Sequence, residues 1–190
     1  MNPMIETFGA LVGKAAAKSP DRARRLLEAA FYASNFQAKH FPSRKLTTAR
    51  AFISPVCMDA VLHPLAHPER SAIVNLFLPC EILHAMRIEP QIAEGLSCYF
   101  SGAGSEQYFI EYARQKGVPD TLCSYHKILL GLAETGVMAR PRFILNTSLA
   151  CDANQLTFRR LAEFWDVPRF TVDVPYAPSE ESVAQVAEQL

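Results

Sequence analysis

Residues 72–78 have the sequence Ala-Ile-Val-Asn-Leu-Phe-Leu, a nearly continuous apolar run that ends at Pro79. This composition is typical of a strand with both faces buried, as in a parallel sheet that helices cover on both sides. Two further apolar runs follow at 142–146 and 169–174, and the second of them ends at Pro175. The sequence therefore predicts at least three short buried strands.

Helical patterns lie between these runs. An amphipathic one covers 105–116, with Gly117 as a stop, and others run from 123 to 136 and from 152 to 165. Strands that alternate with helices predict an α/β fold with an open, mostly parallel sheet flanked by helices. The carboxyl ends of its strands would then share one edge, where such folds place their ligands.

The first part of the chain is different in character. Residues 4–18 are rich in alanine, and residues 21–33 follow Pro20 with apolar side chains on one face, so both predict helices. Prolines punctuate residues 46–70, which predicts short helix and loop. The expected organisation is an N-terminal helical extension at 1–70 and an α/β domain at 71–190.

Composition excludes several classes of protein. Nineteen basic residues balance nineteen acidic ones among 190, so there is no global field to attract nucleic acid or an anionic membrane. No stretch reaches the roughly 18 apolar residues of a membrane span, and the N-terminal residues do not resemble a secretory signal. Five cysteines without such a signal favour a reducing, cytoplasmic location, where thiols pack, bind metals or catalyse.

Two cysteines occupy positions suited to a metal centre. Cys123 and Cys151 each fall where the chain turns into a helix, and Cys151 follows a predicted strand. Thiolates are soft ligands for iron–sulfur clusters and zinc, and clusters accept dispersed ligands, whereas zinc sites more often show paired spacing. The alternative is that both cysteines only pack as small hydrophobic residues.

Three other residues belong to the same predicted edge. Cys80 follows the first strand directly and can supply a third thiol, or it is simply the first residue of a helix. Glu81 is a candidate for moving a proton, although a carboxylate at a helix start also complements the helix dipole. His126 lies one helical turn after Cys123 and titrates near neutral pH, and the alternative is a hydrogen-bonded histidine without a function.

Four segments, in this order, resemble one known family. Residues 77–86, Phe-Leu-Pro-Cys-Glu-Ile-Leu-His-Ala-Met, resemble a Pro-x-Glu-(Leu/Ile)-x-x-Ala segment of 2-hydroxyacyl-CoA dehydratase subunits. Residues 119–126 and 146–152 are similar to the two segments that carry cluster cysteines, and 167–175 resembles the strand and proline that follow. The resemblance covers about residues 71–190.

This resemblance implies a chemistry for the site. The family removes water from an (R)-2-hydroxyacyl-CoA to give the 2-enoyl-CoA, using a [4Fe–4S] cluster and one electron from an ATP-hydrolysing activator protein. Two homologous subunits form a heterodimer. By position, Cys123 and Cys151 are implied as cluster ligands, and Glu81 matches the acid of the Pro-x-Glu segment.

The chain also departs from the family pattern. Family members hold a third cysteine ligand in a second α/β half, which is missing from this sequence. We therefore expect the first half of a longer fold, completed by that half or by a partner. The alternatives are a subunit of the related benzoyl-CoA reductases, or a truncated, non-catalytic relative that binds partners.

Overall fold

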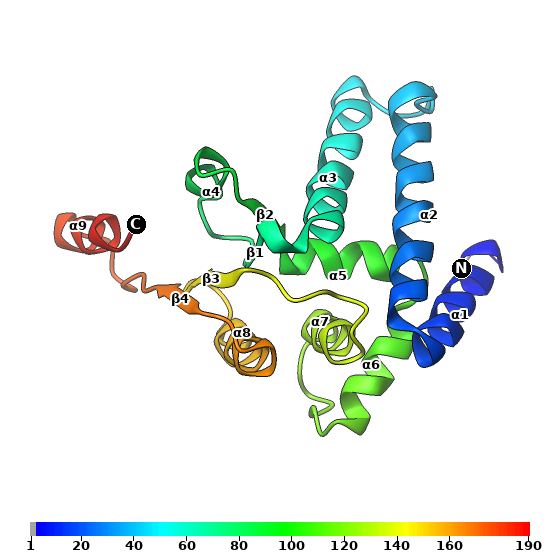
Figure 1. Cartoon of the computed structure of the whole chain (residues 1–190). Helices are drawn as coiled ribbons and strands as arrows, with labels where there is room; N and C mark the ends of the chain where they lie inside the picture. Colours follow the sequence, from blue (N-terminus) through cyan, green and yellow to red (C-terminus); the bar gives the residue numbers. More distant parts are fainter. Residues whose placement is uncertain (1–2) are drawn as a thin grey trace.

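The computed structural model describes residues 3–190, and these form a sheet flanked by helices (Figure 1). The sheet has four strands in the order β2-β1-β3-β4, and all three neighbouring pairs are parallel. The strands are β1 (Ser71–Val74), β2 (Glu89–Ile92), β3 (Phe143–Thr147) and β4 (Arg169–Val172). The predicted α/β fold with an open parallel sheet behind an N-terminal helical segment is confirmed.

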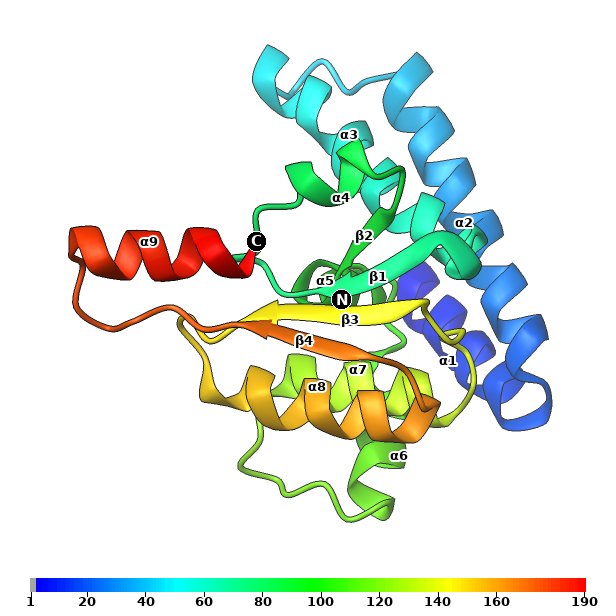
Figure 2. The same cartoon turned by 60° about the vertical axis from the view of Figure 1, so that its left-hand side comes forward.

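The two faces of the sheet belong to different hydrophobic clusters. Ile73 and Ile144 point into the larger cluster, whereas Ala72, Val74 and Val172 point into the smaller one, as the alternation of side chains along a strand requires. Helices α5 (Ala93–Gly102), α7 (Ser124–Glu134) and α8 (Asp152–Trp165) cover the first face. Helices α4 (Glu81–Ala85) and α9 (Glu180–Gln189) contribute to the second. Figure 2 shows α8 and α4 on opposite sides of β3 and β4.

The N-terminal helices share the larger cluster. They are α1 (Pro3–Lys18), α2 (Pro20–His40) and α3 (Thr48–Ala66), and the short 3₁₀ helix η1 (Pro68–Arg70) leads into the sheet. Val12, Leu27 and Leu62 are buried in the same cluster as Ile73 of β1. The first two helices were predicted, although α2 is longer than expected. The division of the chain into two parts after residue 70 stays a prediction. Residues 1 and 2 of the predicted N-terminal extension lie outside the part of the chain that the structure describes.

Two elements differ from the sequence prediction. The region predicted as short helix and loop is the single helix α3, which has Pro55 and Pro64 inside it. Both prolines are buried, so the packing of this helix on the core outweighs their poor helix propensity. Strand β2, with the sequence Glu-Pro-Gln-Ile, was not predicted, because it has no apolar run. It is an edge strand, where a proline is tolerated.

The strand order creates a switch point at the middle of the sheet. The chain passes from β1 through α4 to β2, and from β2 through α5, α6 (Glu106–Gln115) and α7 to β3 on the other side of β1. The loop after β1 leads to α4 on one face and the loop after β3 leads to α8 on the other, so the two loops diverge at the carboxyl ends of these strands, the usual place for a ligand in such folds. We call this region the carboxyl edge. No helix within residues 3–190 combines the length and apolar character that crossing a bilayer requires.

Candidate metal and catalytic site at the carboxyl edge

Two buried side chains join the strands at the switch point. Asn75 follows β1 and Thr147 ends β3, and neither is exposed to solvent by more than a few per cent. Asn75 Nδ2 donates to Thr147 Oγ1 at 3.0 Å, and Thr147 N donates to Asn75 Oδ1 at 3.0 Å. These paired hydrogen bonds hold the starts of the two diverging loops together, because buried polar groups that lost their partners would be destabilising.

Cys151 stands at the end of the loop after β3, as the N-cap residue of α8. The residue before it, Ala150, has a φ of 69°, which is unusual for a side chain with a Cβ. Cys151 N donates to Leu149 O at 2.9 Å, so these three residues form a tight γ-turn around Ala150. Such strained turns collect at functional sites, since the surrounding structure must hold them in place. Here the turn fixes the thiol of Cys151 at the edge.

His126 faces this thiol from the neighbouring helix. It lies in the first turn of α7, is buried, and places Nε2 3.7 Å from Sγ of Cys151. Burial lowers the pKa of His126, because desolvation disfavours the charged imidazolium. A neutral imidazole can donate a hydrogen bond to the sulfur or accept its proton, depending on the tautomer. The pair can therefore move a proton.

Cys123 occupies the start of the same helix. It is the N-cap residue of α7, is exposed, and its carbonyl accepts a hydrogen bond from Lys127 N at 3.1 Å. Tyr125 lies two residues after Cys123, and its Oη accepts a hydrogen bond from Cys98 Sγ at 3.2 Å. This bond raises the pKa of Tyr125, and the charges of Cys98 and Cys123 raise it further. Cys123 and Cys151 thus both begin helices that cover the same face of the sheet.

Cys80 and Glu81 lie on the other side of the switch point. Cys80 packs against the smaller hydrophobic cluster, and its Sγ donates to Leu78 O at 3.4 Å. Burial raises the pKa of the Cys80 thiol, and the neighbouring charge of Glu81 adds to this. Glu81 is the exposed first residue of α4. Within residues 3–190, no hydrogen bond or ion pair joins these two residues to His126 or Cys151.

The donor set suits a thiolate-bound metal only in part. All five cysteines are free thiols, and sulfur with imidazole is the kind of donor set that iron–sulfur and zinc centres use. In the described part of the chain, however, no three side chains of His, Cys, Asp or Glu lie close enough together to hold an ion. Among the predicted site residues, the structure brings His126 into contact with Cys151.

Glu94 is a functional candidate that the sequence did not reveal. It lies in the first turn of α5, where its Oε2 accepts from Leu76 N at 3.1 Å and its Oε1 from Asn154 Nδ2 at 3.4 Å. It therefore links the loop after β1 with the first turn of α8 across the carboxyl edge. The sequence signal for it was a carboxylate directly after a strand, but β2 itself was not predicted.

Comparison with known proteins adds a family to this geometry. A family model described as 2-hydroxyglutaryl-CoA dehydratase, D-component, matches residues 75–190. The match begins at the end of β1 and includes every candidate residue of the carboxyl edge. No match was found among the curated proteins. Since the matched region is more than half of the chain, the protein belongs to the 2-hydroxyglutaryl-CoA dehydratase D-component family.

Proposed function

We propose that this chain is a cluster-binding component of an iron–sulfur 2-hydroxyacyl-CoA dehydratase, which removes water from an (R)-2-hydroxyacyl-CoA to give the 2-enoyl-CoA. Membership of the family supports a dehydratase-type subunit. The observation that carries the finer proposal is the contact of His126 with Cys151, 3.7 Å apart beside the switch point of the sheet. The contact supports the proposal because it brings a thiol, a group of the kind that binds iron, beside an imidazole at the edge where α/β folds bind their substrates.

The proposal assigns Cys123 and Cys151 as ligands of a [4Fe–4S] cluster. Both begin helices on one face of the sheet, and cysteine sulfur is the usual ligand of iron–sulfur clusters. Cys80 belongs to the opposite face and is engaged with Leu78 O. We therefore propose that the remaining ligands come from a second α/β half or a homologous partner subunit rather than from Cys80.

A cluster held in part by Cys123 and Cys151 would supply single electrons for the reaction of the acyl-CoA thioester, and an ATP-dependent activator protein would deliver them. The residues of this chain have other tasks. His126, neutral because it is buried, can hold or move a proton at Cys151 or at a substrate beside it. Glu81 is the exposed first residue of α4 after β1, where its carboxylate can position a hydroxyl group. The Asn75–Thr147 pair joins the ends of β1 and β3 at the switch point.

A second candidate is a non-catalytic relative that binds partners. It is favoured by the aromatic side chains exposed near the far ends of α2 and α3: Phe36, Phe41 and Phe52 are 59%, 69% and 71% exposed. Such apolar surface is typical of a protein interface. A benzoyl-CoA reductase-type subunit would use the same scaffold and the same thiols, and it differs in its substrate.

The test uses protein reconstituted anaerobically with iron and sulfide and then reduced. The account predicts an electron paramagnetic resonance signal that changes when an (R)-2-hydroxyacyl-CoA is added and does not change with free coenzyme A. A signal changed by benzoyl-CoA alone would favour the reductase. A protein that stays colourless after reconstitution would favour the partner-binding relative and would contradict the dehydratase proposal.

A further inference from the structure

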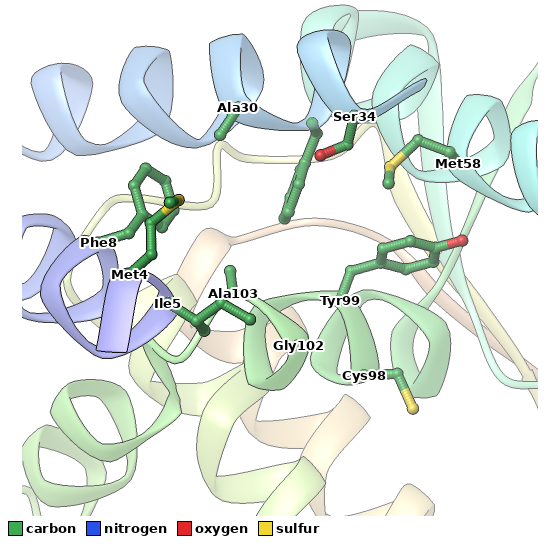
Figure 3. Close-up of a pocket in the computed structure, with 11 residues that line it drawn as sticks. Met4, Ile5, Phe8, Ala30, Ser34, Met58, Cys98, Tyr99, Gly102 and Ala103 are labelled. Atoms are coloured by element: carbon green, nitrogen blue, oxygen red, sulfur yellow. The ribbon is translucent and has the colours of Figure 1, made fainter. Parts of the chain in front are cut away.

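A large apolar cavity lies away from the carboxyl edge, among the N-terminal helices. Its volume is about 590 Å³, and its walls come from α1, α2, α3 and α5 (Figure 3). Phe8 of α1 and Phe31 of α2 line it, Met58 of α3 closes one end, and Gly102 and Ala103 lie opposite Ala30. Small-molecule sites in proteins usually have volumes of about 300–1,000 Å³ and mostly apolar walls.

The lining determines what the cavity can accept. None of its residues is charged, so a charged group inside it would lose its hydration without gaining a partner. Its polar side chains are Ser34, Cys98 and Tyr99. Burial raises the pKa of Tyr99, and the neighbouring charges of Cys57 and Cys98 raise it further. These features select hydrocarbon with at most a weakly polar end.

We propose that this cavity, which is open to solvent on one side, binds the uncharged hydrocarbon portion of a small molecule, an acyl or aryl chain, between helices α1, α2, α3 and α5. A small molecule is favoured because the volume of about 590 Å³ lies in the range of small-molecule sites, and four helices supply the walls, with Ala30 on one wall facing Ala103 on the other. The exposed Phe41 and Phe52 that suit a protein partner do not line this cavity.

The inference does not rest on the proposed dehydratase chemistry. Most of the lining residues, including Phe8, Phe31 and Met58, precede residue 75, where the family match begins. The cavity is therefore built by packing the N-terminal helices of this chain against α5. It remains a binding site whether or not the thiols at the carboxyl edge hold a cluster.

Gly102 allows the cavity to be filled with little strain. A Cβ built on it meets nothing within 4 Å, and its φ lies outside the left-handed region. Two substitutions of different size at this position therefore distinguish the loss of cavity volume from the loss of folding. Gly102→Ala leaves most of the volume open, and Gly102→Phe fills it. Ala30→Phe fills the same space from the opposite wall and serves if the first variant fails to fold.

The experiment titrates the full chain with the neutral dye Nile red, with 1-decanol as competitor. We expect saturable binding with one dye per chain, displaced by decanol, with a negative heat-capacity change on binding of decanol. Gly102→Phe or Ala30→Phe should weaken binding by at least about tenfold, which corresponds to about 1.4 kcal/mol, and Gly102→Ala by much less.

Two results would overturn the inference. One is dye binding that is absent, or that is unchanged in both folded phenylalanine variants. The other is a concentration-dependent dimer, seen by light scattering, that Gly102→Phe abolishes, because a second copy of the chain would then be the occupant.

Discussion

Nε2 of His126 lies 3.7 Å from Sγ of Cys151, although the rest of α7, strand β3 and the loops on both sides of that strand separate the two residues in the chain. The contact exists because α7 and α8 pack side by side on one face of the sheet and both start near the carboxyl edge. It connects a buried, neutral base to a half-exposed thiol held by a strained turn.

The first prediction concerns the reactivity of this thiol. In the cluster-free protein, the imidazole of His126 can take the proton of Cys151 as the sulfur attacks an alkylating agent. His126→Gln should slow the alkylation of Cys151 by iodoacetamide by at least about tenfold. Peptide mass spectrometry measures the rate at each cysteine, and the exposed Cys57 is the internal reference. Equal slowing at both sites would show a general change of structure instead.

The second prediction concerns Glu94. Its carboxylate accepts hydrogen bonds from Leu76 N and from the buried Asn154, so Glu94→Ala leaves a buried amide donor without its acceptor. We expect the free energy of unfolding to fall by about 1–3 kcal/mol in urea titrations. Glu94→Gln keeps one acceptor oxygen and should lose less. If both variants are as stable as the wild type, the link across the carboxyl edge is not maintained in solution.

The third prediction concerns pH and the packing of α2 on α3. Burial alone would raise the pKa of Asp59, but hydrogen bonds from Lys39 and Asn35 outweigh it and lower the pKa. Since the folded-state pKa lies below the unfolded value, the stabilisation is complete above about pH 4 and is lost as the pH falls through the folded value. Asp59→Asn should cost about 1 kcal/mol at neutral pH.

The measurement for Asp59 is a series of denaturation curves between neutral and acidic pH. The difference between the wild type and Asp59→Asn should shrink as the pH approaches the lowered pKa. A difference that stays constant over this range would mean that the carboxylate charge does not stabilise the helix pair.

The fourth prediction concerns the close packing of α6 on α7. A Cβ at Gly131 would stand 2.2 Å from the carbonyl oxygen of Phe109, whereas one at Gly102 meets nothing within 4 Å. Gly131→Ala should therefore destabilise the fold by about 1–3 kcal/mol through overpacking. Gly102→Ala should be neutral or stabilise it by up to about 1 kcal/mol, because alanine favours a helix more than glycine does. Thermal unfolding of the two variants tests this contrast.

The sequence predicted those parts of the fold in which buried residues form apolar runs or recur at regular spacing. The apolar runs at β1, β3 and β4 predicted a parallel sheet, and the residues that follow these strands were correctly placed at one edge. Strand β2 escaped prediction because its sequence, Glu-Pro-Gln-Ile, suits an edge strand without an apolar pattern. Helix α3 escaped because tertiary packing overrides its two prolines.

The site could be predicted only as far as its edge of the sheet. The strand order decides to which face of the sheet each loop turns. This order places Cys80 against the smaller hydrophobic cluster on one face and His126 on α7, which covers the other face. Glu94 was missed together with β2. The cavity between the N-terminal helices and α5 depends on how four helices pack, which no local pattern of residues encodes.

The most direct test of the account is the iron content of the chain after anaerobic reconstitution with iron, sulfide and excess dithiothreitol, whose thiolates can complete the ligand set. The central claim predicts about four irons per chain with the absorption of a [4Fe–4S] cluster. Cys123→Ser and Cys151→Ser should each lose this iron, and Cys57→Ser should keep it. A wild-type protein without iron, or a Cys151→Ser variant that retains the cluster, would contradict the claim.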